Sequence, residues 1–137
     1  MPKRITHEMA LTALAAGISK CRQLKEPSAL AIVDAGGHLI AFMRFDDAAI
    51  STLKIAQCKA YTAVSLRAPT HQWMEMIQPG GPLFGLENTS AGLPYVFFGG
   101  GLPVLQDGEV IGAVGVSGGA AEVDIEIGKE MVAVLQG

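Results

Sequence analysis

Apolar residues recur at intervals of three and four near both ends of the chain, which is the period of a helix with one buried face. Thr6 can cap the first of these helices, which we expect to end near Leu24. Its predicted buried stripe is Leu11, Leu14, Ile18 and Cys21. The last helix is expected over residues 120–135, with a buried stripe of Ala120, Val123, Ile127, Met131 and Val134.

Five short apolar runs bounded by turn residues predict strands. They cover residues 29–34, 38–45, 95–98, 103–106 and 109–116. Asp107-Gly108 between the last two indicates a two-residue hairpin, since a type I′ turn needs positive φ at both central positions. The runs contain almost no polar residues, so both faces of the sheet must be covered. The order of elements predicts an α+β fold: a three-layer α/β/α domain with a five-stranded antiparallel sheet, as in profilin-like proteins.

A further helix is expected over residues 48–68, where the only charges are Lys54, Lys59 and Arg67. A helix so poor in charge cannot have a broad solvated face, so we expect its outer side to meet another subunit or a ligand. A short helix over residues 70–76 and a loop to about Leu93 follow. Charged residues make up only 17% of the whole chain, against about 25% in typical domains, which favours a homo-oligomer.

The net charge, the N-terminal sequence and the two cysteines limit the cellular compartment and the partners that we expect. The net charge is −3 and Lys and Arg do not cluster, so a nucleic-acid partner is not expected. We expect one domain over residues 1–137 and a cytoplasmic location without membrane association, because the N-terminus lacks the apolar core of an export signal. Cys21 and Cys58 lie apart in predicted helices and are expected to be buried, reduced thiols.

No standard catalytic motif or zinc spacing is present, so the histidines are considered one by one. His7 shares the predicted stripe of the first helix, where it is either a partly buried or intersubunit residue or an axial ligand of haem iron. His38 follows a Gly-Gly turn and is expected to face solvent. His71 either borders a pocket or caps a short helix.

Four other residues carry alternative interpretations. Arg44 pairs with the adjacent Asp46 and Asp47, or its guanidinium holds a ligand carboxylate. Lys59 is a solvated or intersubunit lysine, or it carries a proton in a reaction. Ser117, with two glycines after it, can form an anion cradle at a helix start. Asp124 in the first turn of that helix favours the helix dipole but would repel an anion there.

Several segments together resemble the GlcG/HbpS family across nearly the whole chain. They are Val33 to Leu39, Met43 to Asp46, Lys59 to Ala63, Gly99 to Pro103 and Ile111 to Gly118, with Asp124 after them. The resemblance implies a profilin-like domain that assembles into dimers and larger oligomers, often octamers. It also implies haem as a cofactor, because family members include haem-binding proteins.

Two functions of different classes follow. The first is binding of haem, a related tetrapyrrole or another small ligand in an apolar pocket near a subunit interface. The second is a small catabolic enzyme, of isomerase or hydrolase type, acting on an organic acid such as a hydroxy acid or an aromatic ring-cleavage product. The candidate ligand-binding residues are His7, Arg44, Lys59, Gly100, Ser117 and Asp124, with His7 as the candidate metal ligand.

Overall fold

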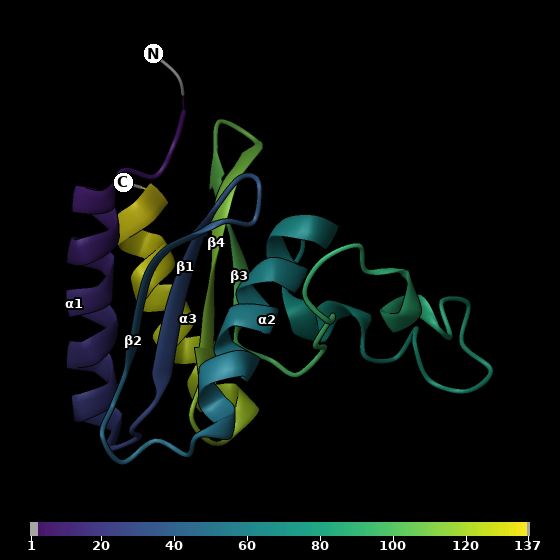
Figure 1. Ribbon diagram of the computed structural model, residues 1–137, viewed down its shortest axis with the longest axis horizontal. Helices are drawn as coiled ribbons and strands as arrows, with labels where there is room; N and C mark the ends of the chain where they lie inside the picture. Colours follow the sequence, from purple (N-terminus) through teal and green to yellow (C-terminus); the bar gives the residue numbers. More distant parts are fainter. Residues whose placement is uncertain (1–2, 137) are drawn as a thin grey trace.

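The computed structural model describes residues 3–136. Three α-helices and four strands form the body of the molecule, and two short 3-10 helices lie in the segment between α2 and β3 (Figure 1). In chain order the elements are α1 (His7–Leu24), β1 (Ala29–Asp34), β2 (Leu39–Arg44), α2 (Ser51–Leu66), η1 (Thr70–Trp73), η2 (Leu86–Thr89), β3 (Gly101–Gln106), β4 (Glu109–Ser117) and α3 (Ala121–Gln136).

The sheet has four strands in the order β2-β1-β4-β3, and every neighbouring pair is antiparallel. The hairpin between β3 and β4 turns at Asp107 and Gly108, whose φ angles of 51° and 79° confirm the predicted turn. The α+β class and the antiparallel sheet are therefore confirmed. The expectation of five strands is wrong.

The predicted strand over residues 95–98 is an irregular segment that crosses α2 instead of joining the sheet. Its backbone groups are bonded to hydroxyl groups of helices: the Val96 N–H donates to Thr62 Oγ1 at 2.9 Å, and the Phe98 carbonyl accepts from Thr70 Oγ1 at 2.6 Å. β3 forms one edge of the sheet, and it contains Pro103 and so offers one N–H fewer to a further strand. The segment therefore finds its partners outside the ladder.

Helices cover both faces of the sheet, as the apolar strands predicted (Figure 1). On one face α1 and α3 pack on the larger side chains, including Leu30, Ile32, Val114 and Val116. On the other face α2 packs on small side chains, including Ala29, Ala31 and Ala113. Small residues on both sides let α2 lie close to the strands.

The buried faces of α1 and α3 are rotated from the predicted stripes. Leu11 is 61% exposed, because α1 turns its smaller residues toward α3 and the sheet. The buried residues of α1 are Ala10, Ala13, Leu14, Gly17 and Cys21. In α3, Ala120 precedes the helix and is exposed, Val123 and Val134 are only partly buried, and Asp124 is buried instead. The buried residues of α3 are Asp124, Ile127, Gly128, Met131 and Leu135.

The pairing of β1 with β4 positions the site described below. Ala29, the first residue of β1, is opposite Ser117, the last residue of β4. The chain entering β1 therefore lies beside the turn that leads from β4 into α3.

Of the helices in the described residues, none has the length and apolarity that crossing a membrane requires. Both cysteines are free and buried, as expected.

Candidate functional site

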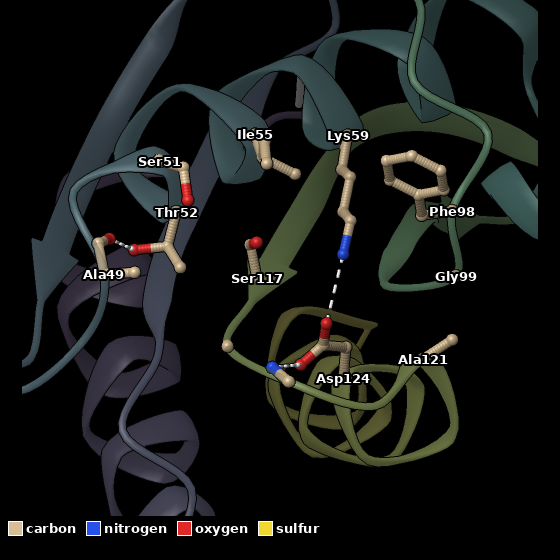
Figure 2. A pocket seen from close by; sticks show the side chains of 12 residues that line it. Ala49, Ser51, Thr52, Ile55, Lys59, Phe98, Gly99, Ser117, Ala121 and Asp124 are labelled. Carbon is tan, nitrogen blue, oxygen red and sulfur yellow. Dashed lines mark hydrogen bonds and ion pairs between the residues drawn. The ribbon is translucent and has the colours of Figure 1, made fainter.

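A pocket of about 400 Å³ opens where α2 begins, β4 ends and α3 begins (Figure 2). Pockets that hold small ligands usually measure about 300–1,000 Å³. Three of the residues expected from the sequence, Lys59, Ser117 and Asp124, come together in it. The full lining is Ala49, Ser51, Thr52, Ile55, Lys59, Phe98, Gly99, Ser117, Gly118, Gly119, Ala121 and Asp124.

A buried ion pair forms one wall of this pocket. The Lys59 Nζ donates to Asp124 Oδ2 at 3.1 Å and to the Val116 carbonyl at 2.8 Å, and each charged residue is only 2% exposed. An ammonium group has three N–H donors. Among residues 3–136 these two acceptors are its hydrogen-bond partners, so one donor is left at the pocket wall. Lys59 is therefore neither solvated nor dependent on a second subunit for burial.

The surroundings of Lys59 act on its pKa in opposite directions. Burial lowers the pKa of Lys59 below its ordinary value, while the charges of Asp124 and Glu26 raise it. Asp124 is itself held in place by the Gly119 N–H, which donates to its Oδ1 at 3.4 Å. The pair thus consists of a cation and an anion fixed by the backbone of β4 and of the turn after it.

Glu26 is the residue of this site that sequence reasoning missed. It follows α1, and its Oε2 is fully buried without a hydrogen-bond partner among the described residues. Burial and the neighbouring Asp124 carboxyl raise the pKa of Glu26 to about 7. In the sequence it stands in Lys25-Glu26-Pro27, which indicates only the end of a helix. Only the pairing of β1 with β4 brings Glu26 to this site, and that pairing was not predicted from the sequence.

Three residues with hydroxyl groups line the pocket: Ser51, Thr52 and Ser117. Ser117 is 6% exposed, lines the pocket, and its side chain makes no hydrogen bond within residues 3–136. Figure 2 shows it between Thr52 and Lys59. Thr52 donates to the Ala49 carbonyl at 2.6 Å, so its hydroxyl proton is used locally. Ser117 is thus a buried polar group whose partner would be a molecule in the pocket.

The first turns of α2 and α3 both border the pocket, and the positive ends of helix dipoles favour an anion there. The two helices differ, because α3 carries Glu122 and Asp124 in its first turn while α2 carries no acidic residue there. An anionic group is therefore favoured on the α2 side of the pocket, near Ser51 and Thr52. This separation reduces the repulsion from Asp124 that the sequence led us to expect.

Gly100, another predicted residue, lies behind the ion pair rather than in the pocket wall. Its φ of 128° is a conformation that residues with a side chain rarely adopt. A Cβ at this position would lie 3.0 Å from the Lys59 Nζ and 3.0 Å from the Asp124 Cβ. Glycine here lets the backbone pass directly against the pair.

The other predicted residues lie elsewhere. His7 is exposed at the start of α1, contrary to the expected apolar surroundings, and borders a second pocket of about 490 Å³ with Arg4 and Asp34. Arg44 is exposed at the end of β2, where its Nη1 donates to the Ala48 carbonyl at 2.9 Å. No ion pair joins Arg44 to the following aspartates in the described part of the chain.

The remaining histidines are both exposed. His38 faces solvent, as expected, with its Nδ1 3.2 Å from Asp34 Oδ1. His71 lies in η1, outside the linings of both the Lys59 pocket and the His7 pocket.

Three curated relatives share much of this sequence. The chain is 45% identical over 106 residues to a 15.0 kDa protein of the dhaT-dhaS intergenic region of Citrobacter freundii, covering 77% of this chain and 74% of that protein. It is 37% identical over 113 residues to the protein GlcG of Escherichia coli K12, covering 82% and 81%. It is 38% identical over 120 residues to the corrinoid adenosyltransferase PduO of Salmonella typhimurium LT2, covering 88% of this chain but only 35% of PduO.

Solved structures agree with these relatives. The protein ORFY of Klebsiella pneumoniae superposes with a TM-score of 0.93 at 36% identity, covering 98% of this chain and 92% of that one. A PduOC:haem complex superposes with a TM-score of 0.89 at 34% identity, covering 96% and 94%. The family model described as haem degrading protein HbpS-like matches residues 5–133. The chain therefore belongs to the HbpS-like family, together with GlcG.

Proposed function

We propose that this protein binds haem or a related tetrapyrrole in a pocket completed by a second copy of the chain. The observation that carries the proposal is structural similarity to the PduOC:haem complex, which extends over 96% of this chain. The description of the matching family, haem degrading, supports the same ligand. Bound haem would supply an iron centre whose chemistry is set by its axial ligand and its surroundings.

The residues around His7 fit such a group. The imidazole is exposed, and neutral imidazole is a common axial ligand of haem iron. Leu11 lies one helical turn further on the same face of α1 and is also exposed, which offers an apolar surface for the macrocycle. Arg4 borders the same pocket and can pair with a propionate. In a single chain this surface faces solvent, so a second copy is needed to cover the haem.

Titration of the purified protein with haemin tests the proposal. We expect a saturable shift of the Soret band in the parent and in His71→Ala, which removes an exposed histidine outside the His7 pocket. His7→Ala should lose the shift or bind haemin much more weakly. An unshifted Soret band of the parent at stoichiometric haemin would overturn haem binding. Equal shifts in all three proteins would show that His7 is not the iron ligand, while haem binding itself would stand.

The Lys59 pocket favours a second function, the binding and conversion of a small organic acid. The specific observation is that, among residues 3–136, Ser117 and one N–H of Lys59 lack partners at the wall of the same pocket. Both are donors that a carboxylate accepts from, and ionisable groups lie next to them. The Arg44 guanidinium, which sequence analysis gave as a candidate for holding a ligand carboxylate, lies outside this pocket. The Lys59 ammonium group takes that role in this second function.

Calorimetric titration with acetate, lactate, pyruvate and benzoate tests this second function. We expect at least one of these acids to bind, and Ser117→Ala to weaken it about tenfold, since a hydrogen bond to a charged group contributes about 1.5–3 kcal/mol. Ser65→Ala, which changes an exposed serine of α2 outside the pocket lining, should bind like the parent. Binding that is unaffected by Ser117→Ala would place these acids outside the pocket.

A further inference from the structure

The Glu26 carboxyl group, with its Oε2 buried, lies beside the buried pair of Lys59 and Asp124. Lys59 donates to Asp124, and Glu26 lies against the turn after β4, where a Cβ on Gly119 would collide with its carboxyl group. The Glu26 Oε2 has no donor within hydrogen-bond reach in residues 3–136. The cluster therefore has one carboxyl group more than its cation neutralises.

A proton resolves this imbalance. A buried carboxylate oxygen without a donor is unfavourable, because it has lost its hydrogen bonds to water and has gained none in the protein. Protonation makes the Glu26 carboxyl neutral and turns it into a donor. Asp124 is the neighbouring acceptor, because Glu26 lies against Gly119 and the N–H of Gly119 donates to Asp124 Oδ1. Two other groups act on the Glu26 carboxyl in the opposite direction: the Ala120 backbone N–H and the Lys59 ammonium group both favour its charged form. The Cys21 thiol of α1 is neutral here, because burial raises its pKa. Asp124 is thus the negative group that favours this proton.

We propose that Glu26 and Asp124 share one proton, and that a carboxylate entering the Lys59 pocket is bound together with a proton taken up by this pair. The second half rests on the organic-acid function proposed above. Glu26 does not line the pocket and acts through Asp124, so it is a positioning residue.

Coupling between proton and ligand follows from the charges. A carboxylate beside Lys59 adds a negative charge close to Asp124, which raises the affinity of the carboxyl pair for a proton. Linkage is reciprocal, so the protonated pair binds the carboxylate more tightly by the same factor. Because the pKa of Glu26 is about 7, the pair is only partly protonated near neutrality. Binding then takes up a fraction of a proton from the buffer, and affinity falls as the pH rises above about 7.

The shared proton is tested without any ligand. Carbon-13 NMR of labelled glutamate should show one carboxyl group, absent from the Glu26→Gln spectrum, that titrates near pH 7. Its raised pKa also makes Glu26 contribute stability below its ordinary pKa of 4.5, and this contribution is lost as the pH rises through about 7. The free energy of unfolding of Glu26→Gln should therefore fall less over this range than that of the parent.

Glu122→Gln is the matched control, because it removes one negative charge from the exposed part of the first turn of α3. Its stability should depend on pH as the parent's does. If every glutamate carboxyl of the parent titrates below pH 5, or if Glu26→Gln follows the pH curve of the parent, the shared proton is refuted.

The coupled uptake is tested with the acid of the panel that binds. Titration in two buffers of different ionisation enthalpy should show proton uptake near pH 7 in the parent and in Glu122→Gln, but none in Glu26→Gln. The affinity of Glu26→Gln should also stay constant between pH 6 and 8. Binding without proton uptake by the parent overturns the coupling and leaves the organic-acid function standing. Failure of all four acids to bind at any pH overturns that function and the coupling with it.

Discussion

At the scale of single residues, the buried pair of Lys59 and Asp124 forms one wall of the pocket. Lys59→Met leaves the buried Asp124 carboxylate without its cation, and breaking a buried pair costs about 3–5 kcal/mol. We expect chemical denaturation to show a loss of that size. The double variant Lys59→Met with Asp124→Leu should lose less than the sum of the two single changes, because no uncompensated charge of the pair remains.

The pair of Lys20 and Glu130 gives the comparison for this prediction. Its atoms are 3.7 Å apart, and Glu130 is about half exposed. Exposed pairs contribute about 0–1 kcal/mol, so Lys20→Met should change stability little. A loss for Lys59→Met no greater than that for Lys20→Met would show that the buried pair does not stabilise this end of the fold.

Some residues of the site could be identified from the local sequence, whereas others could be identified only once the fold was known. Ser117 and Asp124 were found because they flank a predicted helix start, and Lys59 because it lies on a helix almost without charges. Their contact was not predictable, since no local pattern specifies how α2 packs on β4 and beside α3, or that β1 pairs with β4. That pairing places Ala29 opposite Ser117, and so brings Glu26 to the turn before Asp124.

At the scale of elements, the close packing of α2 on the sheet depends on Gly115 of β4. A Cβ at this position would collide with the Ala56 carbonyl and lie 2.7 Å from the Ala60 nitrogen, both of them backbone atoms of α2. Gly115→Ala must therefore displace the helix, and overpacking of this kind costs about 1–3 kcal/mol or more. Thermal unfolding should show a clearly lowered Tm. Ligand affinity in the Lys59 pocket should fall too, because α2 carries Lys59.

Gly36→Ala is a suitable control for this change. The atoms nearest to a Cβ there belong to the exposed side chain of His38, which can move aside. Its Tm should remain close to that of the parent. Equal effects of the two substitutions would mean that α2 is free to shift on β4.

Elements with a strong local sequence signal were predicted well. Elements whose backbone groups or side chains could pack in more than one way were not. The bounds of β1 and of the β3–β4 turn follow from apolar runs and from Asp107-Gly108. Residues 95–98 have the same apolar character, but Thr62 and Thr70 take their backbone hydrogen bonds. The rotation of α1 has a similar cause, because alanine and glycine permit the close approach of α3 whereas a hydrophobicity pattern favours Leu11.

At the scale of the whole molecule, apolar side chains remain exposed around the mouth of the Lys59 pocket. Ile50, just before α2, is 84% exposed, and Phe98, which lines the pocket, is 58% exposed. Leu53 on the first turn of α2 is exposed as well. The segment between α2 and β3 projects from the body, where its surface includes the exposed Phe84 (Figure 1). Exposed apolar groups of this size usually mark a surface that another protein covers.

We therefore expect light scattering to show a homo-oligomer at micromolar concentration, with Ile50 at an interface between copies. Ile50→Glu places a charge where apolar surface would be buried, so it should shift the protein toward smaller species. Ser19→Glu, which adds the same charge to an exposed position of α1, should keep the parent's assembly. Because Ile50 lies next to pocket residues Ala49 and Ser51, dissociation should also open the pocket to water and weaken ligand binding. A parent that is monomeric throughout would contradict the oligomer, and with it the haem pocket that requires a second copy.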